Sequence, residues 1–552
     1  HKPEAEDRKA REYELFNIVL WLTKSNPGCS FASELLTKLR EKHREFGERE
    51  HPDLDSWIGP VTYGEAESSE ASSALLSCDI EQLVTAIQAG PQNGYLEFQS
   101  KDALTHAIEL CAQKSHEWGI KVARAALERC NWTIELWQAL LSAWAATTLS
   151  DDEWRSIVDI LLASSQMYEP AMQSLTSLLH RGIQDTTAPI PAALIADAKN
   201  IADQLWSFIE KSESTELTDH RDWLATAINH PAGRLFEFYL HSLSRLERKQ
   251  LLTEDARNSY KQVFMTALKE VSFAAQLARI LLASQMHFLF NFDPEWTEQN
   301  VFPLLNAQLD KEQARRCWHG YLYWGRWNDS MLLKMMHSYE SMFPLIENEN
   351  EEIQHAFCHH LAGIAVYSSF NVLERGWLFR FLAVVKLATR VTWAAAMRSV
   401  VGGLDDDSKT NLWRRWLKAY WQERLQGRPV PLSAAETGEM VEWATYFGPV
   451  FSEVVDLICK SPYPDLGQSM AYYGLAESEL LKKYPDAFAE LLYFLAAGEK
   501  NRPVYDLDQL YKAVEELVDL VPKHPRIRPL CDELARLGVL GVAKLAARLA
   551  VP

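Results

Sequence analysis

Histidine and cysteine side chains cluster at one place in the sequence, where apolar periodicity predicts a helix. Residues 351–360 read EEIQHAFCHH. Because residues three and four positions apart are neighbours on a helix, His355, Cys358 and His359 would share one side of it. Imidazole nitrogens and thiolates are ligands that zinc takes readily. A metal-dependent helical enzyme is therefore one alternative hypothesis, while ordinary packing of these side chains is the preferred interpretation.

The same segment contains half of a di-iron motif. Glu352 and His355 have the Glu-x-x-His spacing of helical carboxylate-bridged iron sites. Such a site needs a second Glu-x-x-His and two further glutamates on facing helices. The other match in the sequence, Glu48 to His51, runs directly into Pro52 at a predicted helix end. The pattern is incomplete, so we predict no metal-binding residue.

Two other pairs lack a feature that their chemistry requires. Cys317 and His319 have the residue types of a nucleophile and its base, but positions i and i+2 of a helix face apart. We therefore interpret Cys317 as a buried thiol. His116 and Glu117 begin a zinc-protease motif, yet Ile120 stands where the second histidine would be.

Glycine-rich motifs for nucleotide binding or acyl transfer are missing from the sequence. It contains no GxxxxGK[ST], no GxGxxG and no GxSxG. Phosphate cradles and nucleophile elbows need those glycines for their tight backbone turns, so an α/β enzyme is excluded. We predict no catalytic and no cofactor-binding residue, no cofactor, and no enzyme activity in this chain.

The overall charge and the cysteines bound the choice of partners. The 552 residues include 56 Lys or Arg and 75 Asp or Glu, a formal net charge of −19. Such a surface repels phosphate backbones, so we expect no nucleic-acid partner. Eight cysteines without a CxxC motif suit a reducing cytoplasm. The longest apolar region, 361–401, is interrupted by charged residues, so we expect no membrane span.

One predicted helix, 406–426, combines aromatic and basic residues. Trp413, Trp416 and Tyr420 fall at i, i+3 and i+7, on one side of a helix. The cations that interleave with them are Arg414, Arg415, Lys418 and Arg424. The preferred interpretation is a core helix with a solvated basic side. Base stacking beside phosphate contacts and a protein interface anchored by Trp, Tyr and Arg are the alternatives.

The elements that would position these residues are all helical. Apolar residues recur with a period near 3.6, and no sustained two-residue alternation indicates a strand. Capping-box patterns, Asp79 with Gln82 and Ser433 with Glu436, mark two helix starts. Because the predicted helices are joined by short turns, we expect antiparallel neighbours. The fold class is therefore all-α, an irregular α-solenoid or helical-repeat array of stacked antiparallel helix hairpins.

The expected domain organisation has four parts. Residues 64–73 (GEAESSEASS) are polar and acidic and lack large apolar side chains, so we predict a linker there. It would follow an N-terminal helical piece, residues 1–63. A helical array at 74–403 and a C-terminal helical domain at 404–552 would complete the chain.

Two stretches of the sequence resemble a known family. One runs from Arg49 to Leu54 and precedes Trp57; the other is the run from Trp413 to Trp443, within a match of about Asn411 to Leu537. The second stretch resembles an uncharacterised helical domain at the C-terminus of large bacterial proteins. In that family the N-terminal part is often a sirtuin-like NAD-cleaving domain, and the proteins are implicated in antiphage defence by NAD depletion.

The resemblance implies a regulatory role for this chain rather than the catalytic one. His319 and Gly320 resemble the His-Gly of sirtuins, but they lie in a helical aromatic run without a glycine-rich NAD loop. No catalytic residue carries over. Because the chain opens at His1 in a charged stretch, we expect either a part of a longer polypeptide or a chain with an added tag residue at its start.

The resulting hypothesis is a non-enzymatic helical sensor or regulatory module of a bacterial antiphage defence protein. Its concave surface would recognise a protein partner, such as a phage protein, and it would control the NAD-cleaving effector domain absent from this chain. A scaffold for homo-oligomerisation without a sensing role is the alternative, beside the metal-dependent enzyme.

Overall fold

The computed structural model describes residues 4–26, 28–44, 46–47, 75–89, 101–209, 222–466, 474–475, 479–499 and 507–549. Every regular element within these ranges is a helix, which confirms the predicted all-α class. The predicted linker at 64–73 and the family-like stretch from Arg49 lie outside the described residues, and they stay predictions.

The chain divides into two compact units, His1–Cys111 and Ala112–Pro552. The helices of the first unit are α1 (Glu4–Ser25), α2 (Ser30–Lys42), α4 (Ile80–Ala89) and α5 (Lys101–Lys114), whose last turn passes the division. α1 packs against α2 through Phe16, Leu20 and Leu36, which are buried together. Apolar burial of this kind gives a two-helix hairpin its stability.

The second unit contains the remaining helices. Its α-helices from residue 116 to 324 are α6 (His116–Glu128), α7 (Ile134–Ala146), α8 (Asp151–Ala163), α9 (Met172–Gln184), α10 (Ile195–Ile209), α11 (Trp223–Asn229), α12 (Pro231–Arg248), α13 (Glu254–Lys269), α14 (Phe273–Ser284), α15 (Met286–Phe292), α16 (Pro294–Asn300) and α17 (Lys311–Trp324). Those from residue 329 onward are α18 (Asp329–Met342), α19 (Glu351–Tyr367), α20 (Trp377–Val384), α21 (Leu387–Gly402), α22 (Asp406–Leu412), α23 (Lys418–Leu425), α24 (Ala434–Trp443), α25 (Phe451–Ile458), α27 (Leu480–Lys483), α28 (Pro485–Gly498), α29 (Leu507–Leu520), α30 (Ile527–Arg536) and α31 (Val542–Arg548).

Short helical turns connect several of these helices. The 3₁₀ turns are η1 (Ser165–Met167), η2 (Ala192–Leu194), η3 (Phe302–Leu305), η4 (Ile346–Asn348), η6 (Ala444–Tyr446) and η7 (Gly448–Val450). A π-helical turn, η5 (Trp413–Leu417), joins α22 to α23.

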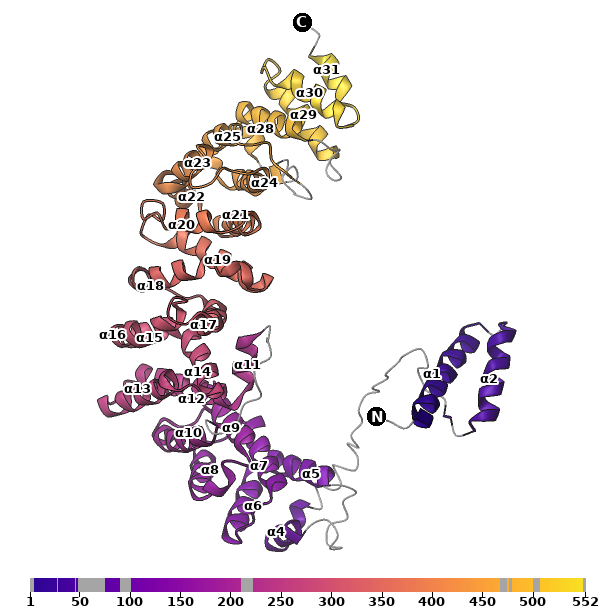
Figure 1. Ribbon diagram of the computed structural model, residues 1–552, viewed down its shortest axis with the longest axis vertical. Coiled ribbons are helices and arrows are strands. Elements are labelled where there is room, and N and C mark those ends of the chain that lie inside the picture. Colours follow the sequence, from indigo (N-terminus) through magenta and orange to yellow (C-terminus); the bar gives the residue numbers. More distant parts are fainter. Residues whose placement is uncertain are drawn as a thin grey trace. The chain divides into compact units, whose positions relative to one another are not determined.

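Seven helices of the second unit form a continuous packing order, which we call the main helix series. It consists of α9, α12, α14, α17, α19, α21 and α24, and each member packs against the next. Figure 1 shows these helices following one another in the order of the sequence. Because α21 packs against α24, the main helix series continues across residue 403, where we predicted a domain boundary. That boundary stays a prediction.

Many of the tryptophans in the sequence lie in the core of the second unit. The tryptophans that are almost completely buried are Trp137, Trp144, Trp318, Trp393, Trp413, Trp416, Trp421 and Trp443. A buried tryptophan removes a large apolar surface from water, so these rings hold neighbouring helices together.

Hydrogen-bonded caps fix where the helices begin. The capping box predicted at Ser433 and Glu436 is confirmed at the start of α24. At the start of α4 the Asp79 carboxylate accepts a hydrogen bond from the Gln82 backbone N–H at 2.9 Å. A second complete capping box, Ser150 with Glu153, starts α8. Each cap satisfies backbone N–H groups that have no partner inside the helix.

No single helix among the described residues is long and apolar enough to cross a membrane. The pair α14 and α15 reaches that length and composition only when taken together, and the two helices meet at 72°.

Candidate functional site

An open hollow lies between α17, α19 and α21, three consecutive members of the main helix series. Its volume is about 730 Å³, within the range of small-ligand and side-chain sites. The residues that line it are Leu322, Trp324, Gly325, Trp327, His355, Ala356, His359, His360, Gly363, Thr392, Ala395, Ala396, Arg398 and Ser399. Within the described part of the chain, no carboxylate belongs to this lining, although the protein as a whole is acidic.

Of the three residues in the alternative metal hypothesis, two meet at this hollow and the third does not. His355 and His359 are exposed on α19 and line it. Cys358 is buried, and its thiol lies 3.8 Å from the carbonyl oxygen of Thr389, to which it donates. Burial raises the pKa of the Cys358 thiol to about 12, so a thiolate ligand is unfavourable there.

The remaining metal candidates are also dispersed. Glu352 is exposed on the first turn of α19 and does not line the hollow. The second Glu-x-x-His match, at Glu48, lies outside the described residues. Among the residues that the structure describes, no group of three or more His, Cys, Asp or Glu is placed to hold a metal ion.

A buried hydrogen-bonded chain stiffens one wall of the hollow. His360 Nε2 lies 2.6 Å from the Tyr339 hydroxyl, which lies 2.9 Å from the Tyr321 hydroxyl. Burial lowers the pKa of His360 to about 3, so this imidazole is neutral at physiological pH. The wall therefore presents a fixed, uncharged ring rather than a titrating group.

Arg398 is the one arginine or lysine in the lining that the structure describes. Its Nη1 contacts Glu442 and also lies 3.4 Å from the Glu439 carboxylate. Within the described residues these contacts use Nη1 alone, which leaves Nε and Nη2 without a hydrogen-bond partner. The two glutamates therefore hold the guanidinium at the hollow while it keeps donors for an incoming group.

The aromatic edge of the hollow was not predicted from the sequence. Trp324 is the last residue of α17, Gly325 follows with a φ of +54°, and Trp327 comes after the turn. Glycine adopts this left-handed conformation without strain, so the chain turns sharply and leaves Trp324 52% exposed. The sequence signal that could have predicted this edge is the pair of tryptophans on either side of a glycine at the end of a predicted helix.

Cys317 and His319 have separate environments on α17. Cys317 is completely buried and accepts a hydrogen bond from the Gln313 side chain at 3.1 Å. Burial raises the pKa of its thiol to about 12. His319 instead pairs with Glu349 at 3.2 Å, and Arg315 contacts the same carboxylate. The two side chains are engaged in different contacts and do not form a nucleophile–base pair.

Gly320, the glycine of the sirtuin-like dipeptide, serves helix packing. A Cβ atom at this position would lie 2.3 Å from the Ile280 carbonyl oxygen of α14. The absence of a side chain therefore permits the close approach of α17 to α14.

His116 and Glu117, the start of the incomplete zinc-protease motif, also have structural partners. His116 Nδ1 lies 2.9 Å from the carboxylate of Glu153, which caps α8. Glu117 pairs with Lys121 one turn later at 2.7 Å. These contacts join α6 to α8 and stabilise α6.

The predicted helix at 406–426 is confirmed, as α22, the π-helical turn η5 and α23. Trp413, Trp416 and Tyr420 are buried on it. The expected solvated basic side is wrong for Arg424, which is 1% exposed. It is also incomplete for Arg415, whose guanidinium donates to three carbonyl oxygens at the end of α19, those of Ala365, Val366 and Ser368, at 2.9–3.3 Å.

The other two cations of this helix, Arg414 and Lys418, are not buried. Lys418 pairs with the Glu453 carboxylate at 2.6 Å, and Arg414 is exposed. The same Glu453 carboxylate accepts a hydrogen bond from the Trp413 indole at 3.2 Å. Base stacking is therefore not available to Trp413 or Trp416, because both rings are inside the protein.

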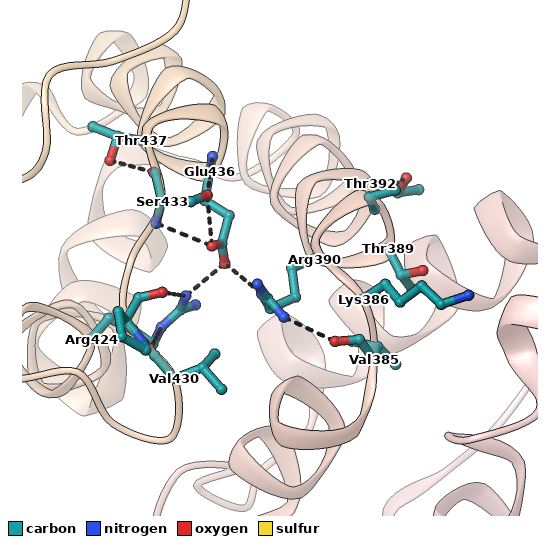
Figure 2. Close-up of polar contacts among 12 residues, drawn as sticks. Val385, Lys386, Thr389, Arg390, Thr392, Arg424, Val430, Ser433, Glu436 and Thr437 are labelled. Atoms are coloured by element: carbon teal, nitrogen blue, oxygen red, sulfur yellow. Dashed lines mark hydrogen bonds and ion pairs between the residues drawn. The ribbon is translucent and has the colours of Figure 1, made fainter.

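Arg424 belongs to a buried ionic cluster that joins α21, α23 and α24. Figure 2 shows Arg424 and Arg390 pointing toward the Glu436 carboxylate from two sides. The distances from Glu436 Oε1 are 2.6 Å to Arg424 Nη2 and 3.4 Å to Arg390 Nε. The other carboxylate oxygen completes the capping box with Ser433.

The charges of this cluster compensate one another. Burial disfavours the Arg424 cation, but Tyr420 and Glu436 outweigh it and raise the pKa of Arg424 above its ordinary value. Burial raises the pKa of Tyr420 to about 12. The cluster holds three helices in register, and it is enclosed rather than open to a ligand.

Comparison with known protein families gives one match. Residues 371–525 match a family described as Domain of unknown function (DUF4020), which covers less than a third of the chain. The predicted domain of unknown function in the C-terminal part is thereby confirmed, while the sirtuin and antiphage associations stay predictions. A comparison with curated proteins finds no match.

Proposed function

We propose that this chain is a non-enzymatic helical module of a bacterial antiphage defence protein. It binds a protein partner and thereby controls an NAD-cleaving effector domain that lies outside this chain, in the cytoplasm. The family resemblance motivates the defence role and the effector. The hollow between α17, α19 and α21 is the observation that supports partner binding.

Within this proposal the fold is an irregular α-solenoid. Members of the main helix series pack against the preceding and following members, as repeats do in solenoids. Solenoids present long surfaces on which a protein partner can contact several successive helices. A partner seated on three members of the main helix series would favour one relative position of those helices, which is how binding can shift the state of an attached domain.

The chemistry of the hollow suits a protein surface. Trp, Tyr and Arg are the residues that most often contribute strongly to protein–protein binding. Here Trp324 is 52% exposed, its neighbour Tyr323 is 62% exposed, and Arg398 retains unused donors. Apolar walls next to a few fixed polar groups favour the insertion of one or two partner side chains.

The test measures NAD in cells that carry the intact protein, before and after phage infection. We expect the double variant Trp324→Ala/His359→Ala to lose infection-triggered NAD depletion, because it removes the aromatic edge and one polar wall. The matched control is Leu333→Ala, an exposed residue of α18 that does not line the hollow. Its response should equal that of the unmodified protein.

Two results would contradict the proposal. Full NAD depletion by the double variant would show that the hollow is not used. NAD turnover by this chain alone, abolished by a substitution within it, would make the chain an enzyme.

A second candidate function, a scaffold for homo-oligomerisation, is favoured by one observation in the first unit. Leu15, Ile18 and Leu22 of α1 are 41–49% exposed at helical spacing, and Phe31 of α2 is 74% exposed. Apolar side chains so placed favour self-association. Light scattering measures the mass of the chain in solution. A monomer at high concentration would exclude the homo-oligomerisation function.

A further inference from the structure

A row of cationic side chains follows the seam between α9 and α12, far along the main helix series from the hollow. We call it the α9–α12 strip, and its cations are four arginines, Arg181 from α9 and Arg234, Arg245 and Arg248 from α12. Two uncharged side chains complete the strip, Gln184 from α9 and His241 from α12, since burial lowers the pKa of His241. The α12 positions are separated by seven, four and three residues, so they lie on one side of the helix. At 1.5 Å per residue they extend over about 21 Å.

Hydrogen bonds across the seam keep the strip in place. Gln184 lies 3.0 Å from the His241 imidazole, and Arg245 Nη1 donates to the Ile190 carbonyl oxygen at 2.6 Å. Arg234 Nη1 lies 3.5 Å from the Gln173 carbonyl oxygen. These bonds go to uncharged groups and use only part of each arginine, so donors remain on Arg234 and Arg245.

Three acidic side chains lie at or near the α9–α12 strip, fewer than its four arginines. Glu237, which lies on the same side of α12, pairs with His180 at 2.6 Å. Glu247 pairs with Arg257 at 3.4 Å. Asp151 is the acidic group that favours the charged form of Arg245. Glu237 likewise favours the charged form of Arg234, whereas Glu247 has a cationic partner outside the strip.

The cations of the strip repel one another. Burial, followed by the charge of Arg181, lowers the pKa of Arg234, and burial, followed by the charge of Arg248, lowers the pKa of Arg245. Glu237 and Asp151 oppose these effects but do not outweigh them. Such clustering opposes folding unless an anion neutralises it. It is also unexpected on a chain whose net charge is −19.

We propose that the α9–α12 strip binds an acidic, extended segment of the partner protein. The inference rests on the proposed function and names the chemistry that the partner carries. An extended chain advances about 3.3 Å per residue, so the strip matches about six residues. Carboxylates at alternate positions of such a segment would point to one side and pair with successive arginines.

The strip favours an acidic peptide over a nucleic acid. Single-stranded nucleic acids need aromatic side chains on which bases stack. α9 and α12, which the structure describes completely, expose no Trp, Tyr or Phe at the strip. The acidic chain around it also repels a long phosphate backbone.

The test uses the full chain and three fluorescent probes: a peptide of alternating Glu and Ala, the same peptide with Gln in place of Glu, and an oligothymidylate of similar length. Fluorescence anisotropy at low and physiological ionic strength gives each Kd. We expect the Glu peptide alone to bind. Salt should weaken its binding, since the contacts are ionic.

Charge reversal assigns the binding to the strip. The variant Arg181→Glu/Arg248→Glu changes two exposed residues and should raise the Kd of the Glu peptide about tenfold or more. The matched control is Arg414→Glu, an exposed cation on the helix at 406–425, and it should leave the Kd unchanged. Circular dichroism checks that both variants are folded.

Three outcomes would overturn the inference: no binding of the Glu peptide at low salt, equal binding by the charge-reversal variant, or preference for oligothymidylate. None of them concerns the hollow. If the strip fails while Trp324→Ala/His359→Ala still abolishes the NAD response, the proposed function stands and only the acidic partner segment is wrong. If the NAD response survives that variant, the proposed function fails whatever the peptide does.

Discussion

Arg424 and Glu436 form a buried ion pair, in which each charge compensates the other for the loss of its contact with water. Both side chains are at most 2% exposed. Removing one member of a buried ion pair leaves the other without compensation, which lowers stability by about 3–5 kcal/mol. We expect Arg424→Ala to reduce the free energy of unfolding by this amount, as measured by urea denaturation.

A matched surface arginine provides the control for this prediction. Arg428 pairs with Glu423 at 2.6 Å but is 60% exposed, so Arg428→Ala should change the unfolding free energy by less than about 1 kcal/mol. The double variant Arg424→Met/Glu436→Gln should recover part of the loss, because neither charge of this pair is left buried without the other, and Arg390 keeps its hydrogen bond to the Val385 carbonyl oxygen. Equal effects of Arg424→Ala and Arg428→Ala would show that the buried pair is not stabilising.

Glu349 gives the protein a specific acid sensitivity. Burial raises the pKa of this carboxyl, but hydrogen bonds from His319 and Arg315 outweigh burial and leave the pKa lowered. A carboxyl with a lower pKa in the folded state contributes stability above its unfolded pKa, about 4.3 for glutamate. This contribution is lost as the pH falls from there through the lowered folded value.

The variant Glu349→Gln isolates this contribution. We expect it to lower the Tm at neutral pH and to make the Tm fall less steeply on acidification than that of the unmodified protein. Thermal unfolding followed between about pH 3 and 7 measures both slopes. Parallel curves for the two proteins would mean that Glu349 is not linked to acid unfolding.

At the scale of elements, the helix at 406–425 has one buried and one solvated side that can be separated by substitution. Trp416 is completely buried, and its indole donates to the Ala365 carbonyl oxygen at 3.1 Å. We expect Trp416→Ala to reduce the unfolding free energy by about 3–5 kcal/mol. Arg414→Ala, on the exposed side, should change it by less than about 0.5 kcal/mol. Comparable losses in urea denaturation would contradict this assignment of the two sides.

The contact between α14 and α17 depends on the glycine at position 320. A Cβ there meets the Ile280 carbonyl oxygen, which belongs to a helix backbone and cannot rotate away. We expect Gly320→Ala to separate the two helices and to reduce the unfolding free energy by about 1–3 kcal/mol. Gly363→Ala is the control, because no atom lies within 4 Å of a Cβ at that position. A neutral Gly320→Ala variant would show that α14 and α17 can move apart freely.

The sequence predicts elements better than their long-range contacts, and the helix at 406–425 shows why. The spacing of Trp413 and Trp416 is local, so periodicity predicts both the helix and its buried side. The hydrogen-bond partners of Arg415 are not local, because the carbonyl oxygens that it binds lie 47–50 residues earlier in the chain. The local sequence around Arg415 would be the same whether its side chain were solvated or capped a distant helix.

The candidate site was predicted in part for the same reason. The i, i+4 spacing of His355 and His359 places both on one side of α19, and both line the hollow. Arg398 and Trp324 come from two other helices, and only the packing of α17, α19 and α21 brings them together. Cys358 belongs to the buried side of α19, since a one-residue step rotates a side chain by about 100°.

At the scale of the whole molecule, overall charge is a poor guide to local surfaces. The formal net charge of −19 predicts repulsion of anions. The main helix series nevertheless carries the cations of the α9–α12 strip and a hollow without a carboxylate among its described lining residues. The net charge is a sum over every side chain, whereas a bound partner contacts only one part of the surface.

The hydrogen bonds from Arg415 and Trp416 to the end of α19 affect where this chain can be divided into fragments. The family match begins at residue 371, yet the carbonyl oxygens that these two side chains bind belong to Ala365, Val366 and Ser368. A gene fragment that starts at the family boundary would encode the donors without their acceptors. The smallest portion that keeps these bonds starts before Glu351, where α19 begins. The matched segment is therefore shorter than the segment that keeps these bonds, and we expect a fragment that starts at residue 371 to be less stable than one that includes α19.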